Sequence, residues 1–364
     1  MEVRVFDSLD ALTPIYDDLL ARAGARSFYL SGPWFRNLAA TALAPGETLR
    51  LYGVERDGRA EALLVARVGG RGGGRAPRAL TGFTNAYSIL YAPLLRDAAA
   101  PGPALTALAA ALAAERPAWD CVHLDSLDRD APLFDALAAA MRGAGFLVQS
   151  YFHFGNAYQT VEGGYDAYLK ALPGQTRSNI KRGAKRLAKD HAFELDIVTG
   201  ADGLDRALAA YDAIYAASWK EPEPFPDFTA GLARACAEAG SLRLGLLHVE
   251  GRPAAAQLWI VAAGQATIYK LAYDEAFKRY SVGTILTDHV LRHVIEADGV
   301  REVDFGRGDD PYKTTWMNAR RERWGLMAFN PRTARGLLAA GRHKLAPALK
   351  GWLTGGGRRR DADA

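Results

Sequence analysis

The stretch VDFGRGDDPYKTTW, residues 303–316, ends a strand-like run in side chains that can move protons or hold charge. They are three carboxylic acids, one phenol and two cations: Asp304, Asp309, Asp310, Tyr312, Arg307 and Lys313. A general base needs a pKa near the working pH, and neighbouring acids or burial can raise a carboxylate toward it. The crowding therefore predicts the edge of an active site. The alternative is a solvated turn in which the acids pair with Arg307 and Lys313.

A second candidate site lies where a helix is predicted to begin, over residues 281–297. Gly283 stands in its first turn, and Ser281 and Thr284 are able to cap it. The free N–H groups and the dipole of such a helix start attract anions. The pattern predicts a pyrophosphate site, formed by Lys278, Arg279, Ser281, Val282, Gly283 and Thr284. The alternative is an ordinary capped helix with solvated basic residues.

Two further residues could approach these groups. Lys270 stands in the strand-like run ATIYKLAY, where alternation places it on one face with Ile268 and Ala272. A buried, unpaired ammonium is costly, so we expect Lys270 to pair with Asp304 or contact donor phosphate, unless it reaches water at an edge. Trp219 lies in the proline-rich stretch SWKEPEPFP, which either lines an acceptor pocket or closes a helix pair.

Composition narrows the function classes. The apolar and charged fractions, 49% and 24%, are those of a globular protein, and a net charge of +4 gives no general field for DNA. The two cysteines lack metal or redox spacing. His289 and His293 share a helix face without a third ligand, so no metal site is predicted. The acidic start and the lack of a long apolar run predict a cytoplasmic protein.

The elements that must position these residues alternate between helix and strand. Helices are predicted over residues 8–23, 104–114, 131–142, 165–172, 175–189, 204–218, 228–239 and 281–297. Strands are predicted over residues 49–55, 60–68, 121–124, 145–154, 193–198, 242–249, 254–263, 266–273, 302–306 and 324–329. Residues 67–78 are rich in glycine and arginine and are predicted to form a loop.

The two halves share a repeat. LRLYGVERDGRAEALLVARV, residues 49–68, aligns without gaps on LRLGLLHVEGRPAAAQLWIV, residues 242–261. Each match is followed by helix, strand and helix. The repeat predicts a duplicated α/β (α+β) fold. We expect domains over residues 1–155 and 156–330, followed by a basic amphipathic tail over residues 331–364.

Three motifs resemble a known family. GRPAAAQLWI, YKLAYDEAFKRYSVGTIL and VREVDFGRGDDPYKTTW are similar to the CelD/BcsL-like branch of the GNAT acyltransferases, which is related to the two-domain Fem-type aminoacyl transferases. The resemblance covers residues 150–330 and reaches the first half only through the repeat. It implies two tandem GNAT-like domains, each a mixed, mostly antiparallel sheet flanked by helices. The family's acyl-CoA loop, Arg/Gln-x-x-Gly-x-Gly/Ala, is only partly matched by residues 280–285.

The resemblance implies transfer of an acyl group from acyl-CoA, a co-substrate rather than a bound cofactor, to an amine. A tyrosine beyond the fifth strand often protonates the thiolate in this superfamily, and Tyr312 holds that region. The predicted catalytic residues are Asp304, Asp309, Tyr312 and Lys313. The donor is predicted to bind Lys270 and the start of the 281–297 helix. The acceptor is predicted to contact Trp219, Arg307 and Trp316.

Two basic stretches bear on the partner. Residues 176–189 place Arg177, Lys181 and Lys185 in one helical row, either a solvated face or an interfacial one. The tail favours an anionic membrane surface, with the protein peripheral on the inner membrane. An amphiphilic amine would follow, and bacterial ceramide synthases, which acylate a sphingoid base, fit this pattern. The alternatives are a Fem-type transfer from aminoacyl-tRNA, an acetyltransferase for envelope polysaccharide, or a non-catalytic scaffold.

Overall fold

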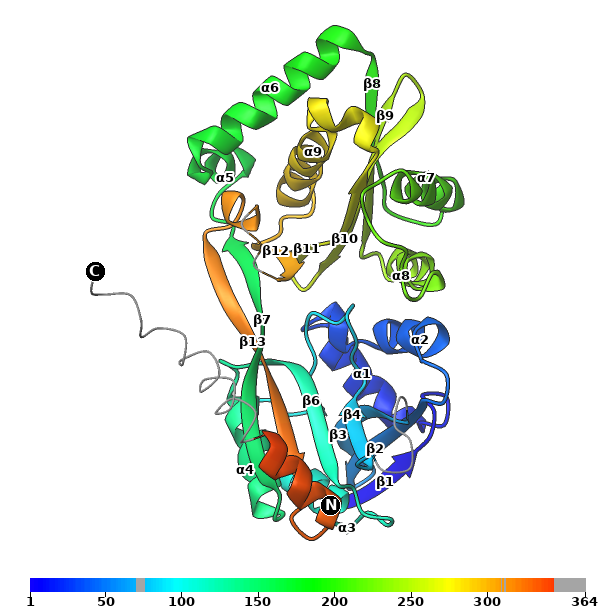
Figure 1. The fold of residues 1–364 in the computed structure, drawn as a ribbon, viewed down its shortest axis with the longest axis vertical. Coiled ribbons are helices and arrows are strands. Elements are labelled where there is room, and N and C mark those ends of the chain that lie inside the picture. Colours follow the sequence, from blue (N-terminus) through cyan, green and yellow to red (C-terminus); the bar gives the residue numbers. More distant parts are fainter. Residues whose placement is uncertain (70–75, 309, 311, 344–364) are drawn as a thin grey trace, which may run out of the picture.

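A computed structural model describes residues 1–69, 76–308, 310 and 312–343 (Figure 1). Asp309, half of the predicted glycine-rich loop and residues 344–364 of the predicted tail lie outside this range. The helical residues 334–343 pack on the protein body, because Ala340 is buried against Cys121 and Phe329. Among the described residues, no helix combines the length and apolar character that crossing a membrane requires.

The described strands form one mixed, mostly antiparallel sheet (Figure 1). They are β1 Glu2–Phe6, β2 Thr48–Arg56, β3 Arg59–Val68, β4 Ala79–Gly82, β5 Leu94–Leu95, β6 Cys121–Asp128, β7 Leu147–Thr160, β8 Phe193–Val198, β9 Leu242–Val249, β10 Arg252–Ala262, β11 Gln265–Tyr273, β12 Glu302–Arg307 and β13 Ala319–Phe329. Their order is β1-β2-β3-β4-β6-β13-β7-β12-β11-β10-β9-β8, with β5 beside β3. Only β4–β6 and β11–β12 are parallel pairs among the named strands. The predicted fold class is confirmed.

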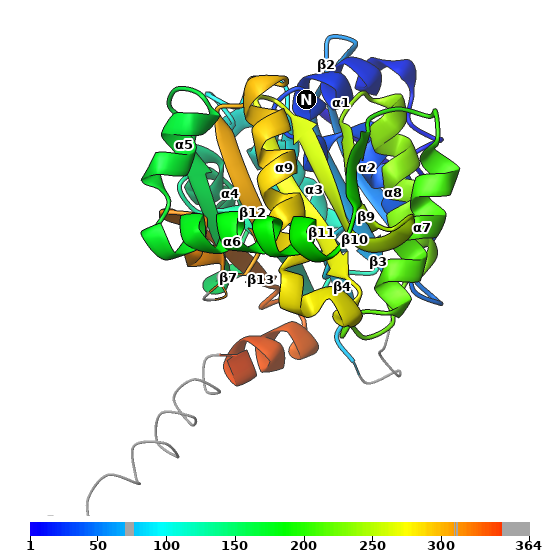
Figure 2. The same cartoon turned by 90° about the horizontal axis from the view of Figure 1, so that it is seen from above.

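The helices cover both faces of the sheet. They are α1 Asp17–Gly24, α2 Gly32–Thr41, α3 Gly102–Ala114, α4 Pro132–Gly143, α5 Tyr165–Ala171, α6 Gly174–Asp190, α7 Leu204–Ala216, α8 Asp227–Glu238 and α9 Val282–Glu296. Seen from above, α9 and α6 lie on one face of β9–β11, and α7 and α8 lie on the other (Figure 2). Each strand of this region therefore buries side chains in two separate cores.

The internal repeat predicted from the sequence is present in the strand register. In the β2–β3 hairpin the register shifts after the pair Val54–Ala62. In the β9–β10 hairpin it shifts after Leu247–Ala255, the positions that the alignment superposes on that pair. A bulge at one position changes the face that every later side chain occupies. Because both hairpins bulge at the position that the alignment superposes, the two halves repeat the same backbone conformation. Two unrelated hairpins would not share this position.

The strands β7 and β13 join the two halves, because each pairs with a strand of the opposite half. β13, the last strand in sequence, pairs with β6 of the first half, while β7 pairs with β12 of the second half. The two also pair with each other, from Tyr158–Ala319 to Leu147–Phe329. The predicted division at residues 155 and 156 stays a prediction, and β7 runs through it without a break.

An aromatic cluster packs the halves together on the α8 face of the sheet. The ring of Trp34 lies 5.8 Å from that of Phe228, and Tyr87 stacks on Phe228 at 4.1 Å. Tyr269 of β11 completes the cluster at 6.4 Å from Phe228. Rings at these separations add favourable contacts beyond their buried area. The first half therefore reaches the region of β11 where the predicted site residues lie.

One predicted helix begins later than expected. Residues 8–23 were predicted to be helical throughout, but α1 begins at Asp17, after a short 3-10 turn over Pro14–Tyr16. Proline lacks the N–H group for an interior helical bond, and Thr13 before it is extended, which disfavours a helix through this point. The sequence pattern also missed α2, β1, β4 and β5. The remaining elements agree with the prediction to within six residues at their ends, and the largest differences are at the end of β7 and the start of β13.

Candidate active site

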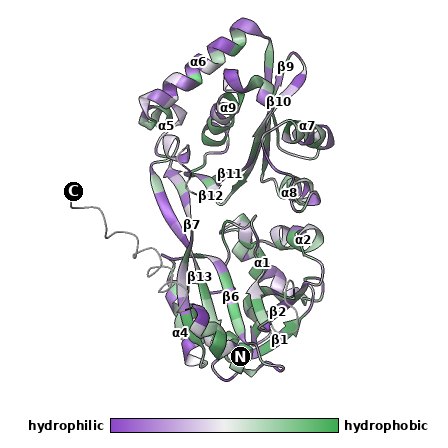
Figure 3. Ribbon diagram, in the orientation of Figure 1, coloured by the Kyte–Doolittle hydropathy of each residue, from purple (hydrophilic) through white to green (hydrophobic). Residues whose placement is uncertain are grey.

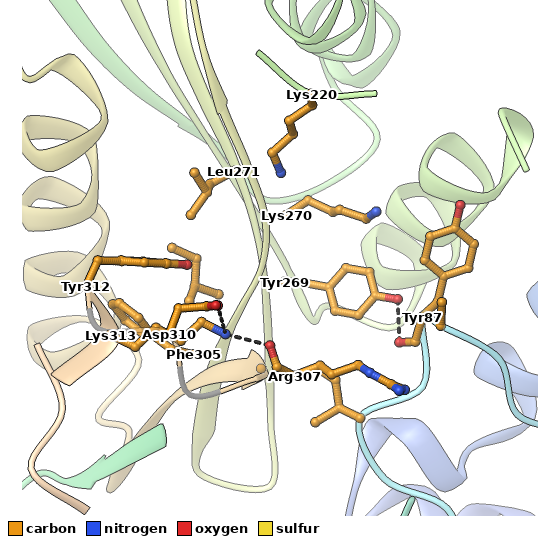
Figure 4. Close-up of a pocket in the computed structure, with 14 residues that line it drawn as sticks. Tyr87, Lys220, Tyr269, Lys270, Leu271, Phe305, Arg307, Asp310, Tyr312 and Lys313 are labelled. Carbon is orange, nitrogen blue, oxygen red and sulfur yellow. Dashed lines mark hydrogen bonds and ion pairs between the residues drawn. The ribbon is translucent and has the colours of Figure 1, made fainter. Parts of the chain in front are cut away.

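The strands β11 and β12 lie side by side only at their first residues and then separate. They pair in parallel as far as Thr267–Asp304. β12 then bulges at Phe305 and Gly306, and Gly306 takes a φ of +66°, which glycine adopts without steric cost. Between the separated strands lies a cavity of about 270 Å³, the reaction cavity (Figure 4). It is lined by Ala86, Tyr87, Ile89, Lys220, Ile268, Tyr269, Lys270, Leu271, Phe305, Gly306, Arg307, Asp310, Tyr312 and Lys313.

A bulge in β11 sets which side chains face the reaction cavity. Lys270 pairs with Leu258 and Ile268 pairs with Trp259, so Tyr269 is an extra residue. Ile268 packs with Trp259 in the core under α9, while Tyr269 belongs to the opposite core. The prediction that Lys270 shares a face with Ile268 is therefore wrong, because the bulge breaks the alternation of the strand.

Lys270 pairs with Glu223, not with Asp304 as was expected. Its Nζ donates a hydrogen bond of 2.5 Å to Oε1 of Glu223 and lies 4.5 Å from the centre of the Tyr87 ring. The hydroxyls of Tyr87 and Tyr215 also donate to this carboxylate, at 2.7 and 3.0 Å. Burial raises the pKa of Glu223, but the hydrogen bonds from Lys270 and Tyr87 outweigh burial and leave the pKa below its usual value. Glu223 is thus held as a carboxylate.

Lys220 enters the reaction cavity from the segment between α7 and α8 (Figure 4). Burial and the nearby Lys270 ammonium lower the pKa of Lys220 to about 8, although Glu223 acts in the opposite direction. An ordinary lysine titrates near 10.4. A lysine with a pKa of about 8 is partly neutral near physiological pH, so it can accept a proton. The sequence analysis did not identify Lys220.

Tyr312 lines the reaction cavity and is half exposed, with its hydroxyl turned inward (Figure 4). Burial, together with the neighbouring Asp310 carboxylate, raises the pKa of Tyr312 to about 12. The phenol is therefore protonated at neutral pH and can donate a hydrogen bond. Asp310 itself is largely exposed, with 65% of its side chain accessible.

Lys313 and Arg307 both line the reaction cavity, but their side chains bond to different partners. Lys313 is 4% exposed, and its Nζ donates to the carbonyl oxygens of Arg307 and Gly308 at 2.5 and 3.1 Å. These bonds hold the loop after β12, a structural task that its predicted catalytic role did not include. The guanidinium of Arg307 donates to His153 Nε2 at 3.0 Å and lies 4.4 Å from the Phe154 ring.

Asp304 lies apart from the other predicted catalytic groups. It is 2% exposed and does not line the reaction cavity. Its Oδ1 accepts from Asn156 Nδ2 at 2.6 Å and from the backbone N–H of Gly306 at 2.5 Å. Its Oδ2 forms an ion pair with Arg321. This network fixes the β12 bulge, so the structure separates Asp304 from Tyr312 and Lys220.

The start of α9 offers free backbone donors. α9 begins at Val282, and the first N–H groups of a helix have no partner within it. Ser281 takes a φ of +58° and its side chain does not cap the helix, contrary to expectation. Lys278 pairs with Glu275 at 3.6 Å, and the Arg279 guanidinium lies 4.6 Å from the Tyr280 ring. Of the residues predicted to bind the donor, only Lys270 also lines the reaction cavity.

The two tryptophans predicted to bind the acceptor have different positions. Trp316 is 7% exposed and packs in the core, 6.3 Å from the ring of Phe305. Trp219 is 49% exposed, packs on Tyr273 at 4.5 Å and directly precedes Lys220 in the chain. Neither lines the reaction cavity. Within the described ranges, no group of three or more His, Cys, Asp or Glu residues is placed to hold a metal ion.

The matching place in the first half is filled by its own chain. β6 bulges against β13 before Leu127, and Ser126 takes a φ of +60°, as Gly306 does in β12. The loop that follows β4 covers this bulge: the N–H of Tyr91 donates to Ser126 O at 3.0 Å, and the Tyr91 hydroxyl donates to Val65 O at 2.7 Å. The same loop then presents Tyr87 and Ile89 to the reaction cavity of the second half.

The part of the chain that forms most of this cavity matches a known protein family. Residues 174–314 match the model of the acetyltransferase (GNAT) domain. The matched residues contain β11, α9, β12 and most of the cavity lining. The GNAT domain match supports the acyltransferase class predicted from the sequence. No curated protein matches this chain.

Solved structures share the fold over nearly the whole chain. FemX superposes with a TM-score of 0.59 at 13% identity, covering 89% of this chain and 97% of FemX. The C-terminal domain of a putative lysylphosphatidylglycerol synthetase from Agrobacterium fabrum gives 0.53 at 16% identity, covering 89% and 95%. L-PGS from Bacillus licheniformis gives 0.53 at 13% identity, covering 90% and 94%. At such identities the likeness shows the fold alone.

Apart from Lys270, sequence reasoning missed the polar groups that reach the reaction cavity from outside residues 303–316. Lys220 and Glu223 lie in the stretch SWKEPEPFP, of which only the tryptophan was assigned a role. Two charged residues in a proline-stiffened segment beside an aromatic residue were the available signal. Tyr87 carried no signal at all, because its position depends on how the first half packs against β11.

Proposed function

We propose that the chain is an N-acyltransferase that moves an acyl group from a CoA thioester to an amine. The observation that carries this proposal is the separation of β11 from β12 past Thr267–Asp304, beside the start of α9. The thioester lies between the separated strands, where the edge of β11 opposite β10 has no partner among the described strands past Thr267, and N–H groups on that edge can stabilise an oxyanion. The pyrophosphate of CoA binds the free N–H groups at Val282, Gly283 and Thr284.

The chemistry is assigned to Lys220 and Tyr312. Neutral Lys220 takes a proton from the acceptor ammonium, and the amine nitrogen attacks the carbonyl carbon of the thioester. The carbon–sulfur bond of the tetrahedral intermediate then breaks. Tyr312 donates its proton to the departing thiolate, and the second proton of the attacking nitrogen restores the phenol. One proton leaves through Lys220, which balances an ammonium and a thioester against an amide and a thiol.

Glu223 and Lys270 position these groups in the proposed mechanism. The pair keeps one negative and one positive charge at fixed places next to Lys220. The Lys270 ammonium lowers the pKa of Lys220, while Glu223 limits that effect. The acids of the β12 motif are therefore not assigned as the base, since Asp304 is enclosed by Asn156 and Arg321.

A second candidate donor is aminoacyl-tRNA, the Fem-type alternative. The surface of α6, which carries many hydrophilic residues (Figure 3), favours it. Five of its basic side chains are exposed and make no ion pair with a described residue: Lys181, Arg182, Lys185, Arg186 and Lys189. Such a row suits a phosphate backbone, and it equally suits the anionic membrane surface proposed from the sequence. A peripheral position on the inner membrane and a sphingoid-base acceptor remain part of the proposal on the acyl-CoA side.

A transfer assay distinguishes these donors. Purified protein is incubated with radiolabelled acyl-CoA thioesters of different chain length and a panel of amines that includes sphinganine. We expect amide product that survives ribonuclease treatment. Loss of product after ribonuclease, with charged tRNA present, would establish the second donor instead. Absence of transfer from both donors, with the protein folded, would favour a non-catalytic role.

A further inference from the structure

The reaction cavity is bounded by apolar residues at the end where β11 and β12 meet. The two strands pair as far as Thr267–Asp304, and Ile268 and Phe305, which follow this pair directly, line the cavity. Ile89 of the first half lines it too, and its Cδ1 lies 3.3 Å from where a Cβ would stand on Gly306. At that distance Ile89 packs directly against the β12 bulge. The cavity therefore ends at Ile89, Ile268 and Phe305, each at most 5% exposed.

The position of Ile89 is fixed by hydrogen bonds on both sides of it, in the loop that follows β4. Two residues earlier, the carbonyl oxygen of Tyr87 accepts from the hydroxyl of Tyr269 at 2.8 Å. Two residues later, the backbone N–H of Tyr91 donates to Ser126 O at 3.0 Å. The loop is thus tied to β11 before Ile89 and to β6 after it. A side chain held in this way cannot move aside easily for a larger ligand.

A polar cavity of about 380 Å³ shares Ile89 with the reaction cavity as part of its wall. Seven of the residues that line the polar cavity are charged: Arg26, Arg301, Arg321, Arg323, Asp128, Glu302 and Asp304. A hydrocarbon chain in this space would take water away from the charged groups without replacing its hydrogen bonds, which is unfavourable. The polar cavity therefore does not extend the space that suits an apolar chain.

The order of these features along β11 gives the direction of the donor. Gln265, where β11 begins, lines the polar cavity, and Ile268 to Leu271 line the reaction cavity. The start of α9 lies at the other end of the strand, since a Cβ on Gly283 would stand 3.3 Å from the ring of Tyr273, the last residue of β11. With the pyrophosphate at the start of α9 and the thioester in the reaction cavity, the acyl group points toward the start of β11 and meets Ile89.

We propose that Ile89 limits the length of the acyl group and that the donor is the CoA thioester of a short-chain acid. The reaction cavity, of about 270 Å³, must hold the reacting atoms of both substrates together with the acyl group, so the space before Ile89 suits a short chain. This inference rests on the proposed function, because it names the acyl class of the same donor. It leaves the sphingoid-base acceptor as proposed, since it concerns only the group carried by the thioester sulfur.

Binding of CoA thioethers measures the space before Ile89 without acyl transfer, because a thioether has no carbonyl carbon for an amine to attack. CoA and its S-ethyl, S-butyl, S-hexyl and S-octyl thioethers are titrated into the full-length protein, with binding heat as the readout. Each CH₂ group that is buried should tighten binding by about fourfold. We expect this gain to end before S-octyl-CoA, which should bind at least about tenfold more weakly than the tightest of the shorter thioethers. S-octyl-CoA binding as tightly as the shorter thioethers, or more tightly, would overturn the proposal.

Substitutions at Ile89 test whether this side chain sets the limit. Ile89→Ala should admit a longer chain and tighten S-octyl-CoA at least about tenfold, whereas Ile89→Phe should shorten the limit and weaken S-butyl-CoA. Ile89→Val is a smaller change in the direction of alanine, for use if the alanine variant does not fold. Ile295→Ala is the matched control: Ile295 is also buried, at 6% exposed, and lies in α9, where it lines neither cavity. Identical chain-length profiles for the Ile89 and Ile295 variants would show that Ile89 does not set the limit.

The proposed function and this inference fail in different ways. If CoA itself does not bind, the proposed donor is wrong and the inference fails with it. If CoA binds and the thioethers show no limit, the proposed function stands and the short acyl group is wrong. If the limit is found but no acyl-CoA gives product, the mechanism assigned to Lys220 and Tyr312 is wrong and the limit stands.

Discussion

The ammonium group of Lys270 donates a 2.5 Å hydrogen bond to the carboxylate of Glu223 inside the reaction cavity. The pair ties β11 to the segment between α7 and α8, and Tyr87 of the first half donates to the same carboxylate at 2.7 Å. Because Lys270 stays charged in this pair, it disfavours a second ammonium beside it. Lys220 is that neighbour, and its lowered pKa follows from the pair.

The first prediction concerns the pH dependence of acyl transfer. Since the pKa of Lys220 is about 8, the neutral base becomes more abundant as pH rises, and kcat/KM should increase up to a plateau above that value. Lys220→Met should reduce kcat at least about a hundredfold and remove this limb of the profile. Lys170→Met, at an exposed lysine in the last turn of α5, is the control. An unchanged limb in the Lys220 variant would exclude Lys220 as the base.

The same lysine makes a prediction about stability. Its pKa is about 8 when folded, below the ~10.4 of an unfolded lysine, so the unfolded state binds more protons between those values. Stability contributed by this group therefore rises with pH across that window. Below pH 8 the net effect of burying the Lys220 ammonium is a loss of stability, so Lys220→Met should melt higher than the unmodified protein at pH 7. The difference should shrink by pH 10, as measured by calorimetry. A difference independent of pH would contradict the lowered pKa.

Tyr312→Phe separates chemistry from folding. The side chain is half exposed, so losing its hydroxyl should leave the melting temperature within a few degrees. Loss of the proposed proton donor should reduce kcat at least about a hundredfold with little change in KM. Tyr273→Phe, at the ring that packs on Trp219, is a control expected to keep near-normal kcat. Equal activity of the two variants would remove Tyr312 from the mechanism.

We expect substitution of Asp304 to lower the free energy of unfolding and substitution of Asp310 to leave it nearly unchanged. Asp304→Asn leaves the buried Arg321 short of a charged partner, and we expect a loss of about 3 kcal/mol or more in the free energy of unfolding. Asp310→Asn should stay within about 0.5 kcal/mol, because 65% of its side chain is exposed. Denaturant unfolding of both variants makes the comparison. A stable but inactive Asp304→Asn protein would return this residue to a catalytic role.

The start of α9 can be tested with a matched pair of substitutions. Gly283→Asp adds negative charge beside the free N–H groups and should abolish stabilisation of the protein by CoA in a melting experiment. Gly283→Ala adds a Cβ 3.3 Å from the Tyr273 ring but no charge, and should retain most of that stabilisation. If CoA protects both variants equally, the pyrophosphate binds elsewhere.

Local sequence determined most of the elements and the duplication. The hairpins, α3 to α9 and the strands other than β1, β4 and β5 follow from hydrophobic period and turn residues, which act within a few positions of each other. The repeat could be recognised in the sequence because matched positions of residues 49–68 and 242–261 carry the same residues. The structure adds that both hairpins bulge at the matched position, after Val54 and after Leu247. The motif around Tyr312 also pointed to one end of β12, where the reaction cavity lies.

Tertiary structure alone decided which groups share that cavity. Glu223 rather than Asp304 meets Lys270, because a one-residue bulge at Tyr269 changes the face on which the lysine stands. Tyr87 arrives from a loop of the first half, more than a hundred residues from Lys220 in the chain. Arg323 belongs to a different cavity because β13 crosses to the first half and pairs with β6. Bulges and long-range pairings depend on the packing of the whole sheet, so no local pattern encodes them.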